Sequence, residues 1–250
     1  MDMRVLLLLL SLASVASAQT GELRVTCSNV IKAAVEQLLP AYQRESGQRV
    51  SITYGASAEL KRSLEAGASF DVALLTTGVI DDLSRQGIIA AASRAGIAQA
   101  NLAVGAKAGS PKADVTTADG MRRRLLDAAS ITYSRDGGGV AAIERMIDAL
   151  GLKEPLKNKT FPQATAGRAG ESVAAGEYEL AFAPLTEIVA APGAQVLGLF
   201  PREFQSPLAI TAGVSARTSS PAATAFIDFL RTRAAMKIIE ATGMAPIENK

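Results

Sequence analysis

The stretch VSITYGASAELKRSLEAG, residues 50–67, predicts a β-strand, a turn and an α-helix in immediate succession. Val50 to Tyr54 is rich in residues that favour strands, whereas Ala58 to Ala66 has helical spacing and ends at Gly67. The turn between them, Gly55-Ala56-Ser57, follows the carboxyl end of the strand. A strand followed by a helix is the first half of a βα unit.

The same order is repeated on both sides of this stretch. Upstream, Leu23 to Cys27 predicts a short buried strand, and Val30 to Arg44 repeats apolar residues at helical spacing. Downstream, Asp71 to Leu75 predicts a third strand, and a helix over Val79 to Gln86 is closed by Gly87. Three such passages indicate a doubly wound parallel sheet, in which ligands bind beyond the carboxyl ends of the strands.

A second set of α/β elements follows, without a linker rich in Pro, Gly or Ser. The predicted strands are 101–106, 130–133, 180–183 and 195–200, the predicted helices are 121–128 and 139–150, and the chain is extended over 208–214 and helical over 221–243 apart from a break. Two sets in one chain predict two lobes that share a hinge. Each lobe is expected to be a mostly parallel sheet flanked by helices, with a ligand cleft between the lobes.

The start of the chain predicts export. Arg4, an apolar run over 5–10 and small residues ending at Ala18 have the order of a cleaved signal peptide, residues 1–18, and the apolar run is too short to span a membrane. Gln19, not a cysteine, follows the expected cleavage point, so we expect no lipid anchor. The mature protein is therefore predicted to be free in the periplasm.

Composition excludes several classes of function. The chain has 26 Lys and Arg against 24 Asp and Glu, a net charge of +2, which gives no electrostatic case for nucleic acid or an anionic membrane. The absence of histidine excludes His-dependent triads and His-ligated metal sites. The single cysteine, Cys27, forms no internal disulfide and is interpreted as a buried thiol. No metal or cofactor is expected.

Several segments in a fixed order carry a family resemblance. They are LRVTCSNVIK (23–32), LPAYQRESGQRV (39–50), YGAS (54–57), LEAG (64–67), FDV (70–72), SITYSRDGGGV (130–140), GEYEL (176–180) and FIDFL (226–230). In this order they resemble the periplasmic solute-binding proteins of ABC importers, and more narrowly the group related to molybdate-binding proteins. The resemblance implies the type II periplasmic-binding fold, with crossings near Leu102 and Leu208. Lobe 1 would comprise 19–102 and 209–250, and lobe 2 would comprise 103–208.

The resemblance also implies an anion site made of hydroxyl side chains and backbone amides at helix starts, where N–H groups and the helix dipole favour negative charge. The candidate ligand-binding residues are Ser28, Asn29, Val30, Ser57, Thr76, Ser134, Arg135, Gly138, Gly139 and Pro184. Val30 stands where the molybdate pattern has a serine, and Ala183-Pro184 where it has a tyrosine. Arg135 is gained, and a guanidinium pairs naturally with a carboxylate. An organic acid is thus an alternative to an inorganic oxyanion.

Each candidate also has a structural interpretation. Ser57 could be a helix N-cap, and Ser28 and Thr76 could bond only to local backbone. The glycines over 137–139 could form a flexible turn instead of admitting a ligand to backbone N–H groups. Arg135 could pair with Asp136 at the surface, and Arg168 presents a weaker version of the same choice.

Two hypotheses of function follow. The first is a monomeric binding protein that presents a small anion to an ABC permease; a sensor or scavenger without a permease has the same sequence signature. The second is an isomerase of an unsaturated tricarboxylic acid, since the group includes an exported aconitate isomerase. Without histidine, its proton-transfer base would come from polar residues near the cleft, of which Tyr54, Glu59, Lys61 and Asp136 are the candidates.

Overall fold

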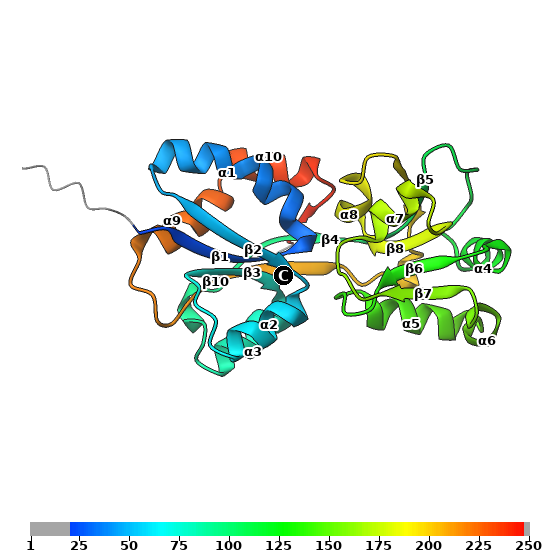
Figure 1. Ribbon diagram of the computed structural model, residues 1–250, viewed down its shortest axis with the longest axis horizontal. Helices are drawn as coiled ribbons and strands as arrows, with labels where there is room; N and C mark the ends of the chain where they lie inside the picture. Colours follow the sequence, from blue (N-terminus) through cyan, green and yellow to red (C-terminus); the bar gives the residue numbers. More distant parts are fainter. Residues whose placement is uncertain (1–20, 248–250) are drawn as a thin grey trace, which may run out of the picture.

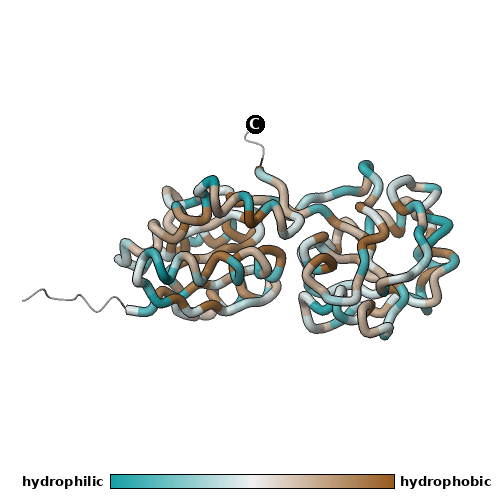
Figure 2. Tube along the Cα trace, turned by 90° about the horizontal axis from the view of Figure 1, so that it is seen from above, coloured by the Kyte–Doolittle hydropathy of each residue, from teal (hydrophilic) through white to brown (hydrophobic). Residues whose placement is uncertain are grey.

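A computed structural model describes residues 21–247 as two β-sheets placed side by side along the long axis of the molecule, each covered by helices on both faces (Figure 1). The predicted signal peptide lies outside the described residues. We call the first sheet with its helices lobe 1 and the second lobe 2. Figure 2 shows hydrophobic segments running through the interior of both lobes, with hydrophilic turns on the outside.

Lobe 1 contains a sheet of six strands in the order β11-β4-β10-β3-β1-β2. The strands are β1 (Leu23–Ser28), β2 (Val50–Gly55), β3 (Val72–Thr76), β4 (Ala95–Ala100), β10 (Leu208–Val214) and β11 (Ala245–Pro246). The helices are α1 (Lys32–Ser46), α2 (Ser57–Glu65), α3 (Thr77–Arg85), α9 (Pro221–Leu230) and α10 (Arg233–Ala241), with short 3-10 turns η1 (Asn29–Ile31) and η2 (Ala91–Ser93). In Figure 1, α1, α9 and α10 cover one face of this sheet, and α2 and α3 cover the other.

Lobe 2 contains a sheet of five strands in the order β7-β6-β8-β5-β9. The strands are β5 (Leu102–Lys107), β6 (Ile131–Ser134), β7 (Thr160–Gln163), β8 (Leu180–Pro184) and β9 (Ala194–Leu199). The helices are α4 (Ala118–Asp127), α5 (Val140–Ala149), α6 (Lys153–Leu156), α7 (Ala169–Ala175) and α8 (Leu185–Val189), and the 3-10 turn η3 (Arg202–Phe204) follows β9. Helices α7 and α8 lie on one face and α5 on the other (Figure 1).

The two-lobed α/β architecture confirms the predicted fold, and each sheet is a mixed sheet with a parallel core. Strands β1, β2 and β3 pair in parallel, as do β6, β7 and β8. In contrast, β10 is antiparallel to β3 and β4, and β5 is antiparallel to β8 and β9. Strands β5 and β10 are the first strands after the two crossings between the lobes. A direct crossing without an intervening helix reverses the strand direction relative to the parallel core.

The two crossings are tied together by one side chain. The chain passes from β4 to β5 at Asn101, and it returns over 200–207. Gln205 in the return crossing accepts a hydrogen bond from the Leu102 N–H at 2.8 Å and donates its amide to the Leu102 carbonyl at 3.0 Å. The side-chain amide therefore imitates a backbone pair and holds the two crossing segments against each other.

Both lobes have apolar interiors made of buried side chains. One cluster of buried side chains runs from β1 and α1 through Ala100 and Leu102 into lobe 2. Cys27 is fully buried in this cluster, which confirms its interpretation as a buried thiol, and burial raises the pKa of the thiol. Over residues 21–247, the helices are all too short or too polar to cross a bilayer.

Candidate functional site

A small cavity lies between the lobes, at the carboxyl ends of the parallel strands of both sheets. Its walls come from the segments that follow β1, β2 and β3 in lobe 1, and from β6, β8 and the 137–139 turn in lobe 2. Nine of the ten predicted ligand-binding residues line it: Ser28, Asn29, Val30, Ser57, Thr76, Ser134, Gly138, Gly139 and Pro184. We call this space the inner cavity. The topological rule for parallel sheets accounts for this convergence.

Three serine hydroxyls of the inner cavity already accept hydrogen bonds from backbone N–H groups. Ser57 Oγ accepts from the Thr76 N–H at 3.1 Å, and Ser134 Oγ accepts from the Gly167 N–H at 3.3 Å. Ser28 Oγ accepts from the Val30 N–H at 3.4 Å. Because a lone pair of each oxygen is occupied in this way, the O–H proton of each is available to donate to a ligand.

These contacts settle two of the structural alternatives. Ser57 is not the N-cap of α2, since Ala56 holds that position and the Ser57 hydroxyl reaches the end of β3 instead. Ser28 does cap the η1 turn through the Val30 N–H, so its local role is real. A capping hydroxyl oxygen keeps its own proton for a second partner.

The glycines over 137–139 allow close approach and do not adopt a glycine-only backbone conformation. None of them has a positive φ angle. A Cβ atom on Gly139 would lie 2.7 Å from Leu102 Cδ2, and one on Gly138 would lie 3.3 Å from Leu208 Cδ2 and 3.6 Å from Thr76 Cγ2. The turn thus packs across the gap between the lobes. Within the described chain, the N–H groups of Gly138 and Gly139 have no protein acceptor.

Arg135 is the one predicted residue that the structure does not bring to the cavity. The chain turns tightly after β6, with the Gly137 N–H donating to the Ser134 carbonyl, and Arg135 is exposed on the outside of this turn. Among the described residues, it forms no ion pair with Asp136 either. The lining of the inner cavity contains no Lys or Arg. The donors in its lining are therefore all neutral: hydroxyls, the Asn29 amide and backbone N–H groups.

Glu187 lines the inner cavity and was not found by sequence reasoning. It lies on α8, directly after β8, and its carboxyl has no hydrogen bond or ion pair within residues 21–247. The residue is partly accessible to solvent, and its partial burial raises the pKa of Glu187 to about 7. The sequence signal for Glu187 is its position just after a late buried strand. At this point of the chain, the family pattern predicts a tyrosine and no acidic residue.

The four residues considered as proton-transfer bases do not line the inner cavity. Glu59 and Asp136 are exposed, and Lys61 pairs with Asp82 at 2.8 Å. The Tyr54 hydroxyl is buried, and this burial raises its pKa, so that ionisation is disfavoured. Of the acidic residues in the described chain, only Glu187 reaches the inner cavity.

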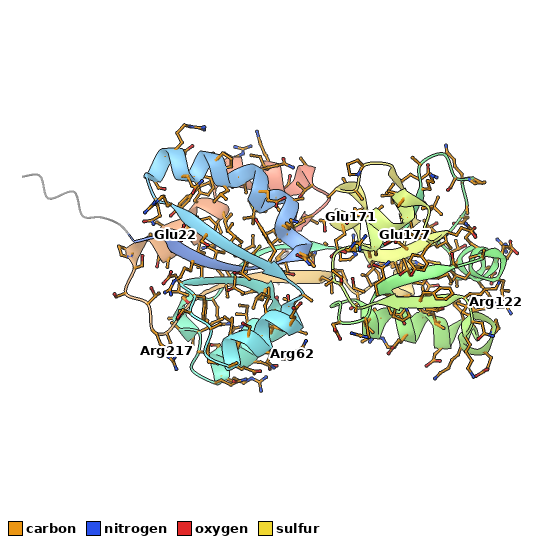
Figure 3. All side chains as sticks on the ribbon, viewed as in Figure 1. Glu22, Arg62, Arg122, Glu171, Glu177 and Arg217 are labelled. Carbon is orange, nitrogen blue, oxygen red and sulfur yellow. The ribbon has the colours of Figure 1, made fainter. Side chains whose placement is uncertain are left out.

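A second, larger cavity adjoins the first. It has a volume of about 250 Å³ and shares Asn29, Ala166 and Glu187 with the inner cavity. Two charged pairs line it: Lys32 with Glu36 at 3.9 Å, and Arg168 with Glu171 at 3.5 Å. We call this space the outer cavity. In Figure 3, Glu171 lies on the upper side of lobe 2 near the junction, whereas Arg62 and Arg122 project from the outer surface.

Two α/β lobes with a small cavity between them, lined in part by hydrogen-bond donors, are the architecture of a protein that captures a ligand between its lobes. The family of bacterial extracellular solute-binding proteins matches residues 23–245, and the chain belongs to this family.

Relatives of known name bind or convert small anions. The chain is 28% identical over 247 residues to an aconitate isomerase from a Pseudomonas species, covering 96% of this chain and 94% of the relative. It is 25% identical over 237 residues to the molybdate-binding protein ModA of Azotobacter vinelandii, covering 91% of each. The solved structure of an Azotobacter vinelandii periplasmic molybdate-binding protein is similar with a TM-score of 0.77 at 23% identity, over 90% of this chain and 100% of that one. This last likeness concerns the fold.

Proposed function

We propose that this protein captures one small anion in the inner cavity and presents it to an ABC permease for import. The observation that carries this proposal is the set of donors. Ser28, Ser57 and Ser134, with their hydroxyls, and Gly138 and Gly139, whose N–H groups have no protein acceptor within residues 21–247, line one space. Hydrogen bonds from neutral groups and helix starts stabilise an anion without a metal or a formal positive charge.

The size of the inner cavity limits what it holds. Its volume is about 40 Å³, and about 10–15 Å³ of such volume accommodates one water molecule. The space therefore suits a group as large as a few waters, such as a tetrahedral oxyanion or one carboxylate group. With Arg135 outside, the argument that favoured an organic acid over an inorganic oxyanion is weaker than the sequence suggested.

The proposed setting is the periplasm, after cleavage behind Ala18, with the protein acting as a monomer. A permease that receives the ligand would contact the rims of both lobes only when they are closed. Genes for a permease and an ATPase beside the gene for this chain would support import. Their absence would favour a sensor or scavenger.

A thermal-shift screen tests the proposal. Mature protein, residues 19–250, is scanned with molybdate, tungstate, sulfate, phosphate and a panel of di- and tricarboxylates. A ligand that binds only the folded state raises the unfolding midpoint by mass action, by about 2.7 kcal/mol of stability at one hundred times Kd. Ser57→Ala should reduce this rise, whereas Ser51→Ala, on the exposed face of β2, should not. No rise with any anion contradicts the proposal.

A second candidate function is isomerisation of an unsaturated tricarboxylate, and Glu187 is the observation that favours it. One carboxylate of the substrate would occupy the inner cavity, and the others would extend into the outer cavity past Glu187. A base with a pKa near 7 is suited to removing a proton from the carbon α to a carboxylate and returning it to the other allylic carbon. The proton leaves one carbon and returns to another, so no further reactant is required.

NMR spectroscopy separates the two functions. Incubation of the protein with cis-aconitate should yield the trans isomer if the chain is an isomerase, and Glu187→Gln should abolish the conversion. If aconitate binds unchanged over hours, or if the Gln variant converts it at the wild-type rate, the isomerase reading fails and binding alone remains.

A further inference from the structure

Glu187 lies at the boundary between the inner and outer cavities. It lines both, together with Asn29 and Ala166. The neighbouring Thr186 hydroxyl is buried and, within residues 21–247, also has no hydrogen-bond partner. A captured anion in the inner cavity would therefore lie beside a carboxyl group that no other protein group neutralises.

The charged groups around Glu187 do not compensate it. Helix α8 packs against β5, β8, β9, α7 and η1. Strands β8 and β9 and the η1 turn carry no charged residue, and Lys107 at the end of β5 lies near Gly176, at the far end of α7. The other nearby charges line the outer cavity, and they form the pairs Lys32 with Glu36 and Arg168 with Glu171. Each cation already has an acidic partner.

Two negative charges side by side in a cavity whose lining contains no Lys or Arg repel each other. We propose that the inner cavity captures its anion together with one proton, which is shared between the Glu187 carboxyl and the bound anion. This inference rests on the proposed function of anion capture. A protonated Glu187 donates a hydrogen bond to a fully ionised anion, and it thereby adds a donor to the hydroxyls and N–H groups.

The proton is available near neutral pH. Because burial raises the pKa of Glu187 to about 7, the carboxyl is protonated in a large fraction of unliganded molecules at this pH. Above that value, capture of a fully ionised anion requires uptake of a proton from solution. Affinity for such an anion should fall about tenfold for each unit of pH, as linkage requires for one proton. An anion that carries its own proton, such as hydrogen phosphate, escapes this loss, because it can donate to ionised Glu187.

Titration calorimetry tests this proposal. Affinities of the mature protein for molybdate, sulfate and trans-aconitate are measured between about pH 7 and 9, where these anions are fully ionised. For each anion that binds, we expect the tenfold loss per unit in the wild type, and a nearly constant affinity in Glu187→Gln, whose amide donates at every pH. Glu177→Gln, on the exposed surface of lobe 2 (Figure 3), should keep the wild-type slope.

A second measurement does not depend on a variant. The heat of binding at pH 8 is compared in buffers of different ionisation enthalpy, and uptake of one proton makes it vary linearly with that enthalpy. Affinity that is constant with pH and heat that is independent of buffer would overturn the proton-coupled capture and leave anion binding intact. If none of the anions binds at any pH, both the proposed function and this inference fail.

Discussion

Replacing Glu187 by glutamine should stabilise the unliganded protein at alkaline pH and leave it nearly unchanged at acid pH. In the folded chain, burial raises the pKa of Glu187 from its ordinary value of 4.5 to about 7. The folded state therefore binds more protons than the unfolded state between these values, and the stability that Glu187 contributes is fully present below about pH 4.5 and lost as pH rises to about 7.

The magnitude follows from the same difference. At about 1.4 kcal/mol per unit of pH, the wild type loses up to about 3 kcal/mol relative to the glutamine variant, whose side chain does not titrate. For a chain of this length, that corresponds to about 6–12 °C in Tm. The difference should be close to its full size at pH 8 and smallest near pH 5.

Thermal unfolding followed by circular dichroism, at pH 5, 6, 7 and 8 without added anions, measures this effect. Phosphate and sulfate buffers are avoided, since both are candidate ligands. The Glu177→Gln variant controls for loss of one negative charge from the surface. A Tm difference between wild type and Glu187→Gln that is the same at pH 5 and pH 8 would refute the reasoning, because the carboxyl would then not be held in an unfavourable environment.

Three further substitutions test the inner cavity and the sheet of lobe 1. Gly139→Ala should cost about 1–3 kcal/mol in urea unfolding, because its methyl group would lie 2.7 Å from Leu102 Cδ2. Ser57→Ala should weaken anion binding at least tenfold in calorimetry, since one donor is lost. Asp71→Asn should destabilise the protein by about 1–2 kcal/mol at pH 7. Burial alone would raise the pKa of Asp71, but the hydrogen bonds that its carboxylate accepts, chiefly from Arg24, outweigh burial and lower this pKa. This stabilisation is present above about pH 4 and lost as pH falls through the lowered pKa, which acid unfolding measures.

Much of the fold was predictable because local pattern and final structure agree. The strands at 23–28, 50–55 and 72–76 each contain at least two β-branched residues, and each is followed by a helix of clear spacing. The sequence pattern does not predict strands β4 and β7, for two different reasons. The sequence AGIAQA of β4 has little intrinsic preference for a strand and is held by pairing with β10, whereas β7 is an edge strand containing Pro162.

The site was predictable to the extent that topology determines it. Ser57 and Thr76 come together because parallel strands end at one edge of a sheet. This proximity depends on the strand order and not on the conformation of the side chains. The two errors concern side-chain direction and environment. Nothing in the sequence tells which side of the turn Arg135 occupies. No local pattern marks Glu187 as partly buried, because this depends on the packing of α8 against distant elements of lobe 2 and against η1 of lobe 1.

The strand order of lobe 1 has a consequence for biosynthesis. Thr76 at the end of β3 pairs with Ile210, which is 134 residues later in the chain. At about 5–20 residues per second, β10 is synthesised roughly 7–27 s after β3, so one edge of β3 is without its partner for at least that time. Lobe 2, by contrast, is built from the contiguous segment 102–199 and has all its strands earlier. We therefore expect the second lobe to fold first and the first lobe last, the reverse of the order in which they begin to emerge.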